Sequence, residues 1–520
     1  MKTNLTPAMT AITLLSTLAI PVQLAAQDNQ DHHHKHHHYK LIDVGTFGGS
    51  ESAVNFPVDL NDRGVNKHAV TVGFSATATH RLPTSHPLIC GGDDGYGSFI
   101  THAFRWQDGS VTDLGALPPE KTNCSNAYQV NASGEIAGFS ENGELDPLLP
   151  YNQSRAVRWK DGQIEDLGSF GGNQNIAGGI NNRGQIVGFS TNGILDPFSP
   201  NGEQTRAFLW QNGQMQDLGT LGGPDALASY INERGQIAGI SYTSTTPNPV
   251  TGVPPLEPFL WENGKMLDLG TLGGAVGFVG GLNNRGQVIG VSSVAANAAA
   301  CFTEFDPNCH PFLWSQDKLI DLNTSTIGGK PSRVAAINDA EHIVGTAAFP
   351  NASFDAYLWK NGVAIDLGHL AIDCFSEATA INSHSQVVGN SFSCDDNSYH
   401  AFLWENGSII DLNAQIPAES PLQLPLAFDI NDRGEIAGIG LPPGVPLASV
   451  FTEGHAFLLI PCDDNHTGVE GCDYSMVDAT AAAPETSPTV RNTTVRMLPQ
   501  SLVHRMSPHR FPGPAFGPRN

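Results

Sequence analysis

One unit recurs along most of this chain, and a tryptophan marks nearly every copy. The sequence contains seven tryptophans, spaced 45 to 53 residues apart, and each stands in a short apolar run such as Phe259-Leu260-Trp261. A fixed period of this length is typical of propellers and solenoids. We interpret the tryptophans as packing between repeats rather than as a surface for stacking sugars. Their positions are Trp106, Trp159, Trp210, Trp261, Trp314, Trp359 and Trp404.

Each unit contains the patterns of four short strands, seen most clearly around Trp261. The run at 259–261 places aromatic side chains at i and i+2, on one face of a strand. Asn263-Gly264 then favours a type I′ hairpin turn, because both residues tolerate positive φ, and residues 265–269 form the return strand. Two further strands lie within residues 281–292 and are joined by an Asn-x-x-Gly turn. We call the four strands a, b, c and d in chain order and predict one antiparallel sheet per unit.

An aspartate in strand b and a glycine in strand d each occur eight times. Residues repeated in every unit are most simply structural. We therefore expect each aspartate to accept backbone N–H groups of the following turn, and each glycine to allow close approach of two strands. In the first unit, residues 64–69 extend the turn between strands c and d. The repeated residues are Asp43, Asp113, Asp166, Asp217, Asp268, Asp321, Asp366 and Asp411, and Gly73, Gly138, Gly188, Gly239, Gly290, Gly345, Gly389 and Gly438.

The two ends of the repeat region each carry half of a hairpin. The chain enters the repeats with a lone strand b at residues 39–45 and leaves them with a lone strand a at residues 455–460. Pairing of these two strands would complete an eighth sheet and close a ring, leaving only short protected edges. We predict an all-β fold, an eight-bladed β-propeller of four-stranded antiparallel blades closed by its first and last strands.

The remaining segments indicate export. Residues 1–26 have the charged start, apolar stretch and small-residue end of a secretory signal peptide. We assign 27–38 to a His-rich disordered spacer, 39–461 to the propeller, 462–474 to a Cys-closed loop and 475–520 to a disordered basic tail rich in Pro and Ala. No segment suits a membrane span. We expect a periplasmic or extracellular protein whose histidine run is either a solvated linker or a transition-metal binder.

The net charge restricts the classes of partner, and the cysteine content indicates the cellular compartment. A net charge of −25 argues against nucleic acid as a partner, because phosphate binding needs clustered basic residues. Eight cysteines in an exported chain predict disulfides. In an antiparallel meander the b–c and d–a loops share one face, and six cysteines fall in those loops. Pairing of neighbours predicts Cys90–Cys124, Cys301–Cys309, Cys374–Cys394 and Cys462–Cys472.

The motifs resemble those of the HAF family of extracellular repeats. The closest matches are His400-Ala-Phe-Leu-Trp404, Asp217-Leu-Gly-Thr-Leu-Gly-Gly223 and Ile180-Asn-Asn-Arg-Gly-Gln-Ile-Val-Gly188. The resemblance covers about residues 39–459 and implies a bacterial exported propeller, without an established activity. Several units depart at the motif histidine, where Arg155, Arg206, Glu257 or Asp355 stands instead.

No motif of a known catalytic class is present in a usable context. We favour a secreted non-catalytic binding or scaffold module for a glycan, a peptide or a cell-surface protein. The alternative is a propeller-type carbohydrate-active enzyme, a glycoside hydrolase or lyase, whose catalytic groups should break the repeat symmetry. We predict no catalytic residue and no cofactor, with Ca²⁺ as a third option in which the ion only stabilises the structure.

Two related inserts between strands d and a supply the first residues to test for ligand binding. Each contains a Leu-Asp-Pro segment, with Asp146 in one and Asp196 in the other. Functional groups of repeat scaffolds tend to lie where loops vary on a rigid frame, so we place a ligand or Ca²⁺ site on the b–c and d–a loop face. The alternative is that each Asp-Pro only starts a turn.

Overall fold

The computed structural model describes most of the repeat region. The described residues are 38–54, 64–86, 90, 98–119, 122–295, 301, 308–324, 330–350, 354–395, 397–463, 465–467, 469–470 and 472. The predicted signal peptide, nearly all of the His-rich spacer, and the basic tail lie outside these residues.

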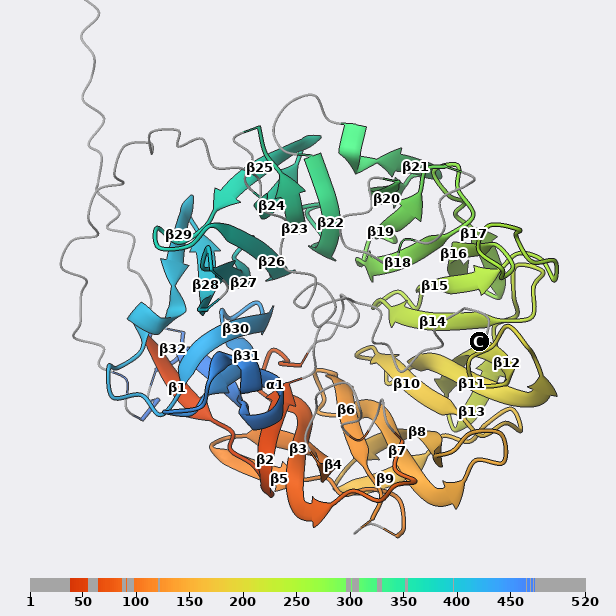
Figure 1. Cartoon of the computed structure of the whole chain (residues 1–520), viewed down its shortest axis with the longest axis horizontal. Helices are drawn as coiled ribbons and strands as arrows, with labels where there is room; N and C mark the ends of the chain where they lie inside the picture. Colours follow the sequence, from red (N-terminus) through yellow and green to blue (C-terminus); the bar gives the residue numbers. More distant parts are fainter. Residues whose placement is uncertain are drawn as a thin grey trace, which may run out of the picture.

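The described strands form eight four-stranded antiparallel sheets arranged as the blades of a ring (Figure 1). In every blade strand c lies nearest the axis, followed outward by d, a and b. The chain is therefore an eight-bladed β-propeller, as predicted. The described residues also contain three short 3-10 helices and one α-helix. These are η1 (Leu322–Thr324), η2 (Leu412–Gln415), η3 (Leu447–Ser449) and α1 (Val450–Glu453).

The blades follow the chain in order. Blade 1 comprises β2 (Gly48–Val54), β3 (Thr71–His80), β4 (Phe99–Gln107) and β5 (Ser110–Asp113); blade 2, β6 (Ser125–Val130), β7 (Ile136–Leu145), β8 (Asn152–Lys160) and β9 (Gln163–Asp166); blade 3, β10 (Asn175–Ile180), β11 (Ile186–Leu195), β12 (Glu203–Gln211) and β13 (Gln214–Asp217); blade 4, β14 (Ala226–Ile231), β15 (Ile237–Tyr242), β16 (Leu256–Glu262) and β17 (Lys265–Asp268). Blade 5 comprises β18 (Gly277–Leu282), β19 (Val288–Ser293), β20 (Cys309–Ser315) and β21 (Lys318–Asp321); blade 6, β22 (Lys330–Ile337), β23 (Ile343–Ala348), β24 (Phe354–Lys360) and β25 (Val363–Gly368); blade 7, β26 (Phe375–Ile381), β27 (Val387–Phe392), β28 (Tyr399–Glu405) and β29 (Ser408–Asp411).

Blade 8 joins the two ends of the repeat region. It comprises β30 (Gln423–Ile430), β31 (Ile436–Leu441), β32 (His455–Pro461) and β1 (Tyr39–Asp43). Strand β1 pairs with β32 over five residue pairs, from Tyr39 opposite Pro461 to Asp43 opposite Phe457. The Ser52 amide of blade 1 also donates to the Gly454 carbonyl at 2.9 Å. The predicted closure is therefore confirmed: the first and last strands share one blade.

Local backbone chemistry explains how each blade is so compact. The a–b turn at Asn263 and Gly264 has φ values of +52° and +81°, as a type I′ turn requires. A Cβ on any of the eight strand-d glycines would overlap a carbonyl oxygen of strand c. In blades 2 to 8 that glycine pairs with the residue just before a β-bulge in strand c. The predicted reason for these glycines is confirmed.

The tryptophans pack between blades, as predicted. Trp261 of blade 4 is 7% exposed and shares a hydrophobic cluster with Leu209 of blade 3. The Trp159 indole N–H donates to the Leu114 carbonyl of the preceding blade at 3.0 Å. The Arg158 guanidinium lies 4.5 Å from the ring centre of Trp210 in the next blade, a cation–π contact.

Four disulfides link the cysteines in the four predicted pairs, and no cysteine is free. Three of the bridges lie on the face that carries the b–c and d–a connections: two of them join separate loops, and Cys301–Cys309 closes a single d–a loop. The fourth, Cys462–Cys472, closes a small loop after the last strand. Within the described part of the chain, no helix has both the length and the apolar character that a membrane span requires.

Candidate functional site

A closed belt of asparagines surrounds the propeller axis at the c–d turns. In each blade the side-chain Nδ2 of one asparagine donates to the backbone carbonyl of the equivalent asparagine in the next blade, at 2.7 to 3.1 Å. Each of the eight is 1–9% exposed. The eight hydrogen bonds form a complete circle, so every blade is fastened to both neighbours. The belt residues are Asn66, Asn131, Asn181, Asn232, Asn283, Asn338, Asn382 and Asn431.

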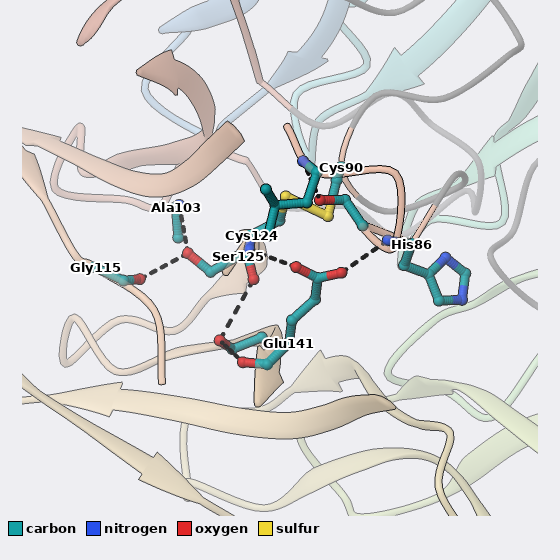
Figure 2. The surroundings of a disulfide bond; sticks show 10 residues. His86, Cys90, Ala103, Gly115, Cys124, Ser125 and Glu141 are labelled. Atoms are coloured by element: carbon teal, nitrogen blue, oxygen red, sulfur yellow. Dashed lines mark hydrogen bonds between the residues drawn. A yellow bond between two sulfur atoms is a disulfide. The ribbon is translucent and has the colours of Figure 1, made fainter. Parts of the chain in front are cut away.

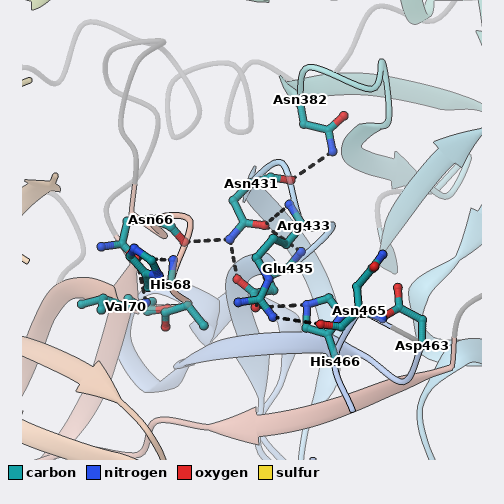
Figure 3. Close-up of polar contacts among 12 residues, drawn as sticks. Asn66, His68, Val70, Asn382, Asn431, Arg433, Glu435, Asp463, Asn465 and His466 are labelled. Carbon is teal, nitrogen blue, oxygen red and sulfur yellow. Dashed lines mark hydrogen bonds and ion pairs between the residues drawn. The ribbon is translucent and has the colours of Figure 1, made fainter. Parts of the chain in front are cut away.

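Each belt asparagine also builds its own turn. Its Oδ1 accepts the backbone N–H groups of the residues two and four positions later, as Asn431 does from Arg433 at 2.9 Å and from Glu435 at 3.0 Å (Figure 3). Asx turns of this kind are why asparagine is favoured at such positions. One short side chain thus satisfies two turn amides and one carbonyl of the next blade.

Blade 1 reaches the same geometry with a different sequence. Asn66 joins the belt, and Ala69, at φ +59°, occupies the place that glycine has in most units. The segment at 64–69, expected to be an extension of the turn, therefore contains the turn itself. The Asn431 side chain donates to Asn66 at 2.7 Å and completes the belt across the closing blade (Figure 3).

A cavity of about 370 Å³ lies on the axis beside the belt, and all eight blades contribute to its wall. The residue before each belt asparagine is aliphatic in every blade. These residues form a ring of apolar side chains and comprise Val65, Val130, Ile180, Ile231, Leu282, Ile337, Ile381 and Ile430. The residue after each belt asparagine also lines the cavity. These form what we call the rim, and comprise Lys67, Ala132, Asn182, Glu233, Asn284, Asp339, Ser383 and Asp432.

The rim breaks the repeat symmetry that the belt keeps. It carries three carboxylates, on Glu233, Asp339 and Asp432, and one ammonium group, on Lys67. Several rim side chains are held by the preceding blade: the Asn284 amide donates to Asp339 Oδ1 at 2.7 Å, and the Ser383 amide to Asp432 Oδ1 at 2.9 Å. The carboxylates are therefore fixed in place while they give the cavity a negative entrance.

A cluster of one buried histidine and two carboxyl groups joins the closing loop to the same face (Figure 3). His466 lies in the loop closed by Cys462–Cys472, and its side chain is 1% exposed. Its Nδ1 is 2.6 Å from Asp463 Oδ1 and its Nε2 is 3.2 Å from Glu435 Oε1. Glu435 also accepts from the belt residue Asn431. The loop is thus anchored to the turn of blade 8 and supports the belt at the point of closure.

The opposite face carries the disulfides and the variable loops. Around Cys90–Cys124, the buried Glu141 accepts the His86 amide at 2.7 Å through Oε1 and the Cys124 amide at 2.9 Å through Oε2 (Figure 2). Burial raises the pKa of the Glu141 carboxyl to about 7, although both hydrogen bonds favour its charged form. Glu141 thus fastens both ends of the bridge to blade 2.

The two residues predicted to bind a ligand or Ca²⁺ are turn formers in neighbouring blades. Asp146 Oδ1 accepts the Leu148 amide, and Asp196 Oδ1 accepts the Phe198 amide, each at 2.7 Å. Both side chains are nearly buried, and each belongs to its own d–a loop. These contacts agree with the alternative in which Asp-Pro starts a turn. A role for Asp146 and Asp196 in binding stays a prediction.

The repeated strand-b aspartates are structural, as predicted. In all eight blades Oδ1 accepts the amide of the residue two positions later at 2.8 Å. The motif histidine often pairs with the same carboxylate, as His102 does with Asp113 at 3.0 Å. In blade 3, Arg206 takes its place and lies 3.0 Å from Asp217. These contacts tie strand a to strand b and involve no cleft.

Sequence reasoning missed the axial cavity, because it treated the c–d turns as simple chain reversals. The signal was present in the residue after each belt asparagine, which varies among Lys, Ala, Asn, Glu, Asp and Ser while the turn around it repeats. The criterion of broken symmetry, applied to the turns as well as to the loops, would have found it.

No protein-family model matches this chain, and a search of curated proteins finds no relative. Among solved structures, the chain is similar to the β-propeller domain of the Trilobed protease from Pyrococcus furiosus, at 12% identity over 61% of this chain and 87% of that chain, with a TM-score of 0.31. It is also similar to a puromycin-hydrolyzing peptidase of Mycobacterium tuberculosis, at 12% identity over 78% of this chain and 63% of that chain, with a TM-score of 0.35. For the Dos1 propeller the identity is 9% over 81% of this chain and 95% of that chain, with a TM-score of 0.37. These likenesses concern the propeller fold alone.

Proposed function

We propose that this protein is an exported, non-catalytic binding module of the HAF repeat type, and that its ligand enters the axial cavity at the c–d turn face. The observation that carries the proposal is the layered wall of the cavity. A ring of eight aliphatic residues lies next to a rigid polar belt and a rim with three carboxylates. Ligand sites of proteins are typically concave, mostly preformed, and combine an apolar surface with a few placed polar groups.

Charge and shape favour a peptide segment as the ligand. The aliphatic ring suits an apolar side chain, and the rim carboxylates suit lysine or arginine residues beside it. The described residues that line the cavity include one aromatic, Phe428, which is little surface for stacking a sugar. Eight inter-blade hydrogen bonds fix the wall of the cavity, so little conformational entropy is lost when a ligand binds. The four disulfides suit an oxidising compartment, which supports export.

The test is a binding screen with basic peptides that carry one central apolar residue, run beside a glycan array. We expect binding to such peptides that weakens with salt, and at least a tenfold loss of affinity in the double variant Asp339→Asn, Asp432→Asn. The matched control is Asp108→Asn, Asp161→Asn. It removes the same charge from two a–b turns, where blades 3 and 4 already carry asparagine at Asn212 and Asn263.

Two results would contradict the proposal. Equal loss of affinity in the rim and control variants would show a non-specific effect of net charge. Binding that appears only on the glycan array, and that the rim variant leaves unchanged, would point to a different ligand class and a different surface.

A further inference from the structure

Two consecutive blade junctions on the loop face share one construction but differ in charge. At the junction of blades 2 and 3, the loop between β7 and β8 carries Asp146; at the junction of blades 3 and 4, the loop between β11 and β12 carries Asp196. The turn hydrogen bonds match, because the Asp146 amide donates to Tyr151 at 2.9 Å and the Asp196 amide to Gly202 at 3.0 Å. The Oδ1 atoms are used alike, as described above. Each Oδ2 is thus left for a residue of the following blade.

In the first junction that residue is an amide. Gln174, just before β10, donates from Nε2 to Asp146 Oδ2 at 2.7 Å. Its own Oε1 accepts the Ser154 hydroxyl at 2.9 Å. The buried carboxylate of Asp146 therefore has a partner for each of its oxygens, and Gln174 adds no charge to the junction.

In the second junction the equivalent residue is a second carboxylate, Asp225, just before β14. The backbone places it as it places Gln174: the Gln174 carbonyl accepts the Thr191 amide and the Asp225 carbonyl accepts the Tyr242 amide, each at 3.0 Å. Burial raises the pKa of the Asp225 carboxyl to about 7, and the negative charge of Asp196 contributes to the same shift. Asp225 therefore occupies, near Asp196, the position from which Gln174 contacts Asp146. The Asp225 side chain has no N–H group to donate there.

The Asp225 carboxylate is only half satisfied. The residue is 0% exposed, and its Oδ1 accepts the Thr205 amide at 2.6 Å. Its Oδ2 is buried without a hydrogen-bond partner among the residues that the structure describes. The nearby Arg206 is occupied elsewhere, since its guanidinium donates to Asp217 at 3.0 Å and to the Pro224 carbonyl at 3.4 Å. The charge of Arg206 favours the ionised form of Asp225, but neither buried carboxylate makes an ion pair within the described residues, and one oxygen of Asp225 has no partner. The junction is therefore incomplete as it stands.

We propose that Asp196 and Asp225 hold a hard cation, and specifically Ca²⁺, between blades 3 and 4. The two carboxylates balance its charge. Further oxygens are at hand, since the hydroxyls of Ser199 and Thr205 lie 3.4 Å apart in the same loop and strand. Burial raises the pKa of the Tyr242 hydroxyl, and the charges of Asp225 and Asp196 raise it further, as expected for an oxygen near both carboxylates. An all-oxygen donor set with irregular geometry suits Ca²⁺, which accepts six to eight oxygens, better than Mg²⁺ or a transition metal. The site would fasten blade 4 to the loop of blade 3.

The test compares thermal unfolding and calorimetric titration with CaCl₂ after chelation, at pH 7.5. We expect one Ca²⁺ per chain in this site and a rise in Tm that grows with the Ca²⁺ concentration, as binding to the folded state requires. Asp225→Gln copies the neutral junction at Gln174, so it should fold but lose the Ca²⁺-dependent rise. Asp225→Asn is the variant of equal size if the longer side chain does not fit. Asp146→Asn, at the neutral junction, is the control and should keep the rise.

Either of two outcomes overturns the proposal. If Ca²⁺ leaves the Tm of the wild type unchanged while Asp225→Asn raises it without metal, the two carboxyls are held by a shared proton instead. If Asp146→Asn abolishes the Ca²⁺-dependent rise as fully as Asp225→Gln does, the cation binds elsewhere. Because this site and the axial cavity lie on opposite faces, rim variants should leave the Ca²⁺ response intact.

Discussion

The two faces of the propeller differ in how regularly their buried polar residues recur from blade to blade. On the turn face, eight asparagines make the same three contacts in every blade. On the loop face, some buried polar groups differ from blade to blade: Glu141 lies beside the disulfide of blade 2, and Asp225 takes the place that Gln174 has in the preceding blade. The first pattern is what a scaffold needs, because each contact fastens one blade to the next. The second marks places where a particular junction has acquired its own chemistry.

Within the turn face alone, repeated residues and variable residues also lie side by side. The belt and the rim are adjacent in sequence, yet the belt is identical in all blades and the rim varies. The repetition of the belt in all eight blades indicates a structural role. Variation at the next residue, on a frame that does not vary, is the reason why we propose that the rim selects a ligand.

The largest effect should come from opening the ring, on which both faces depend. Deletion of residues 39–46 removes β1 and leaves the edge of β32 unpaired. We expect loss of cooperative thermal unfolding, together with aggregation in size-exclusion chromatography. Deletion of residues 27–37 serves as the control truncation and should leave the melting curve unchanged. A cooperative transition at the wild-type temperature after loss of β1 would contradict the closure.

A smaller effect should separate the belt from the rim. Asn232→Ala leaves the amides of Arg234 and Gln236 without their acceptor and removes the bond to Asn283, so we expect a loss of about 3 kcal/mol in the free energy of unfolding. Asn284→Ala, at one rim position in the next blade, removes a half-buried hydrogen bond to the Glu233 amide and an exposed one to Asp339, and should cost about 1 kcal/mol. Urea unfolding measures both. Equal costs would remove the distinction between belt and rim.

The last prediction concerns how the stability contributed by the loop face depends on pH. Burial raises the pKa of Glu141 to about 7 from an ordinary value of 4.5, so the folded chain keeps a proton that the unfolded chain loses. The stability that this proton provides is fully present below pH 4.5 and is lost as the pH rises through 7. Relative to Glu141→Gln, the wild type should therefore lose about 3 kcal/mol across that window.

The measurement is urea unfolding from pH 4.5 to pH 7.5 for both proteins. The exposed Glu144, in the same strand, is the control, and Glu144→Gln should follow the wild-type curve. Parallel curves for wild type and Glu141→Gln would show that the Glu141 carboxyl ionises as readily in the folded state as in the unfolded state.

Much of the fold followed from contacts within a few residues along the chain. The Asn-Gly turns, the aspartates that accept the amide two positions later, and the strand-d glycines each depend on local backbone geometry. Local geometry can be inferred from residue type. Neighbour pairing of the cysteines was also correct, because loops of adjacent blades that share a face lie within reach of each other. The choice of binding face rested on loop length, which says nothing about what converges on the axis.

By itself, the sequence determined the four-stranded unit, its eight copies, the pairing of the first and last strands, and the four disulfides. Only the tertiary structure decided that Asn66 enters the belt, that eight rim residues about 50 positions apart share one cavity, and that Asp225 stands opposite Asp196 where Gln174 stands opposite Asp146. The physical reason is distance along the chain. A turn or a glycine is decided by its immediate neighbours, whereas contacts across the axis or between blades depend on the curvature with which eight twisted sheets close.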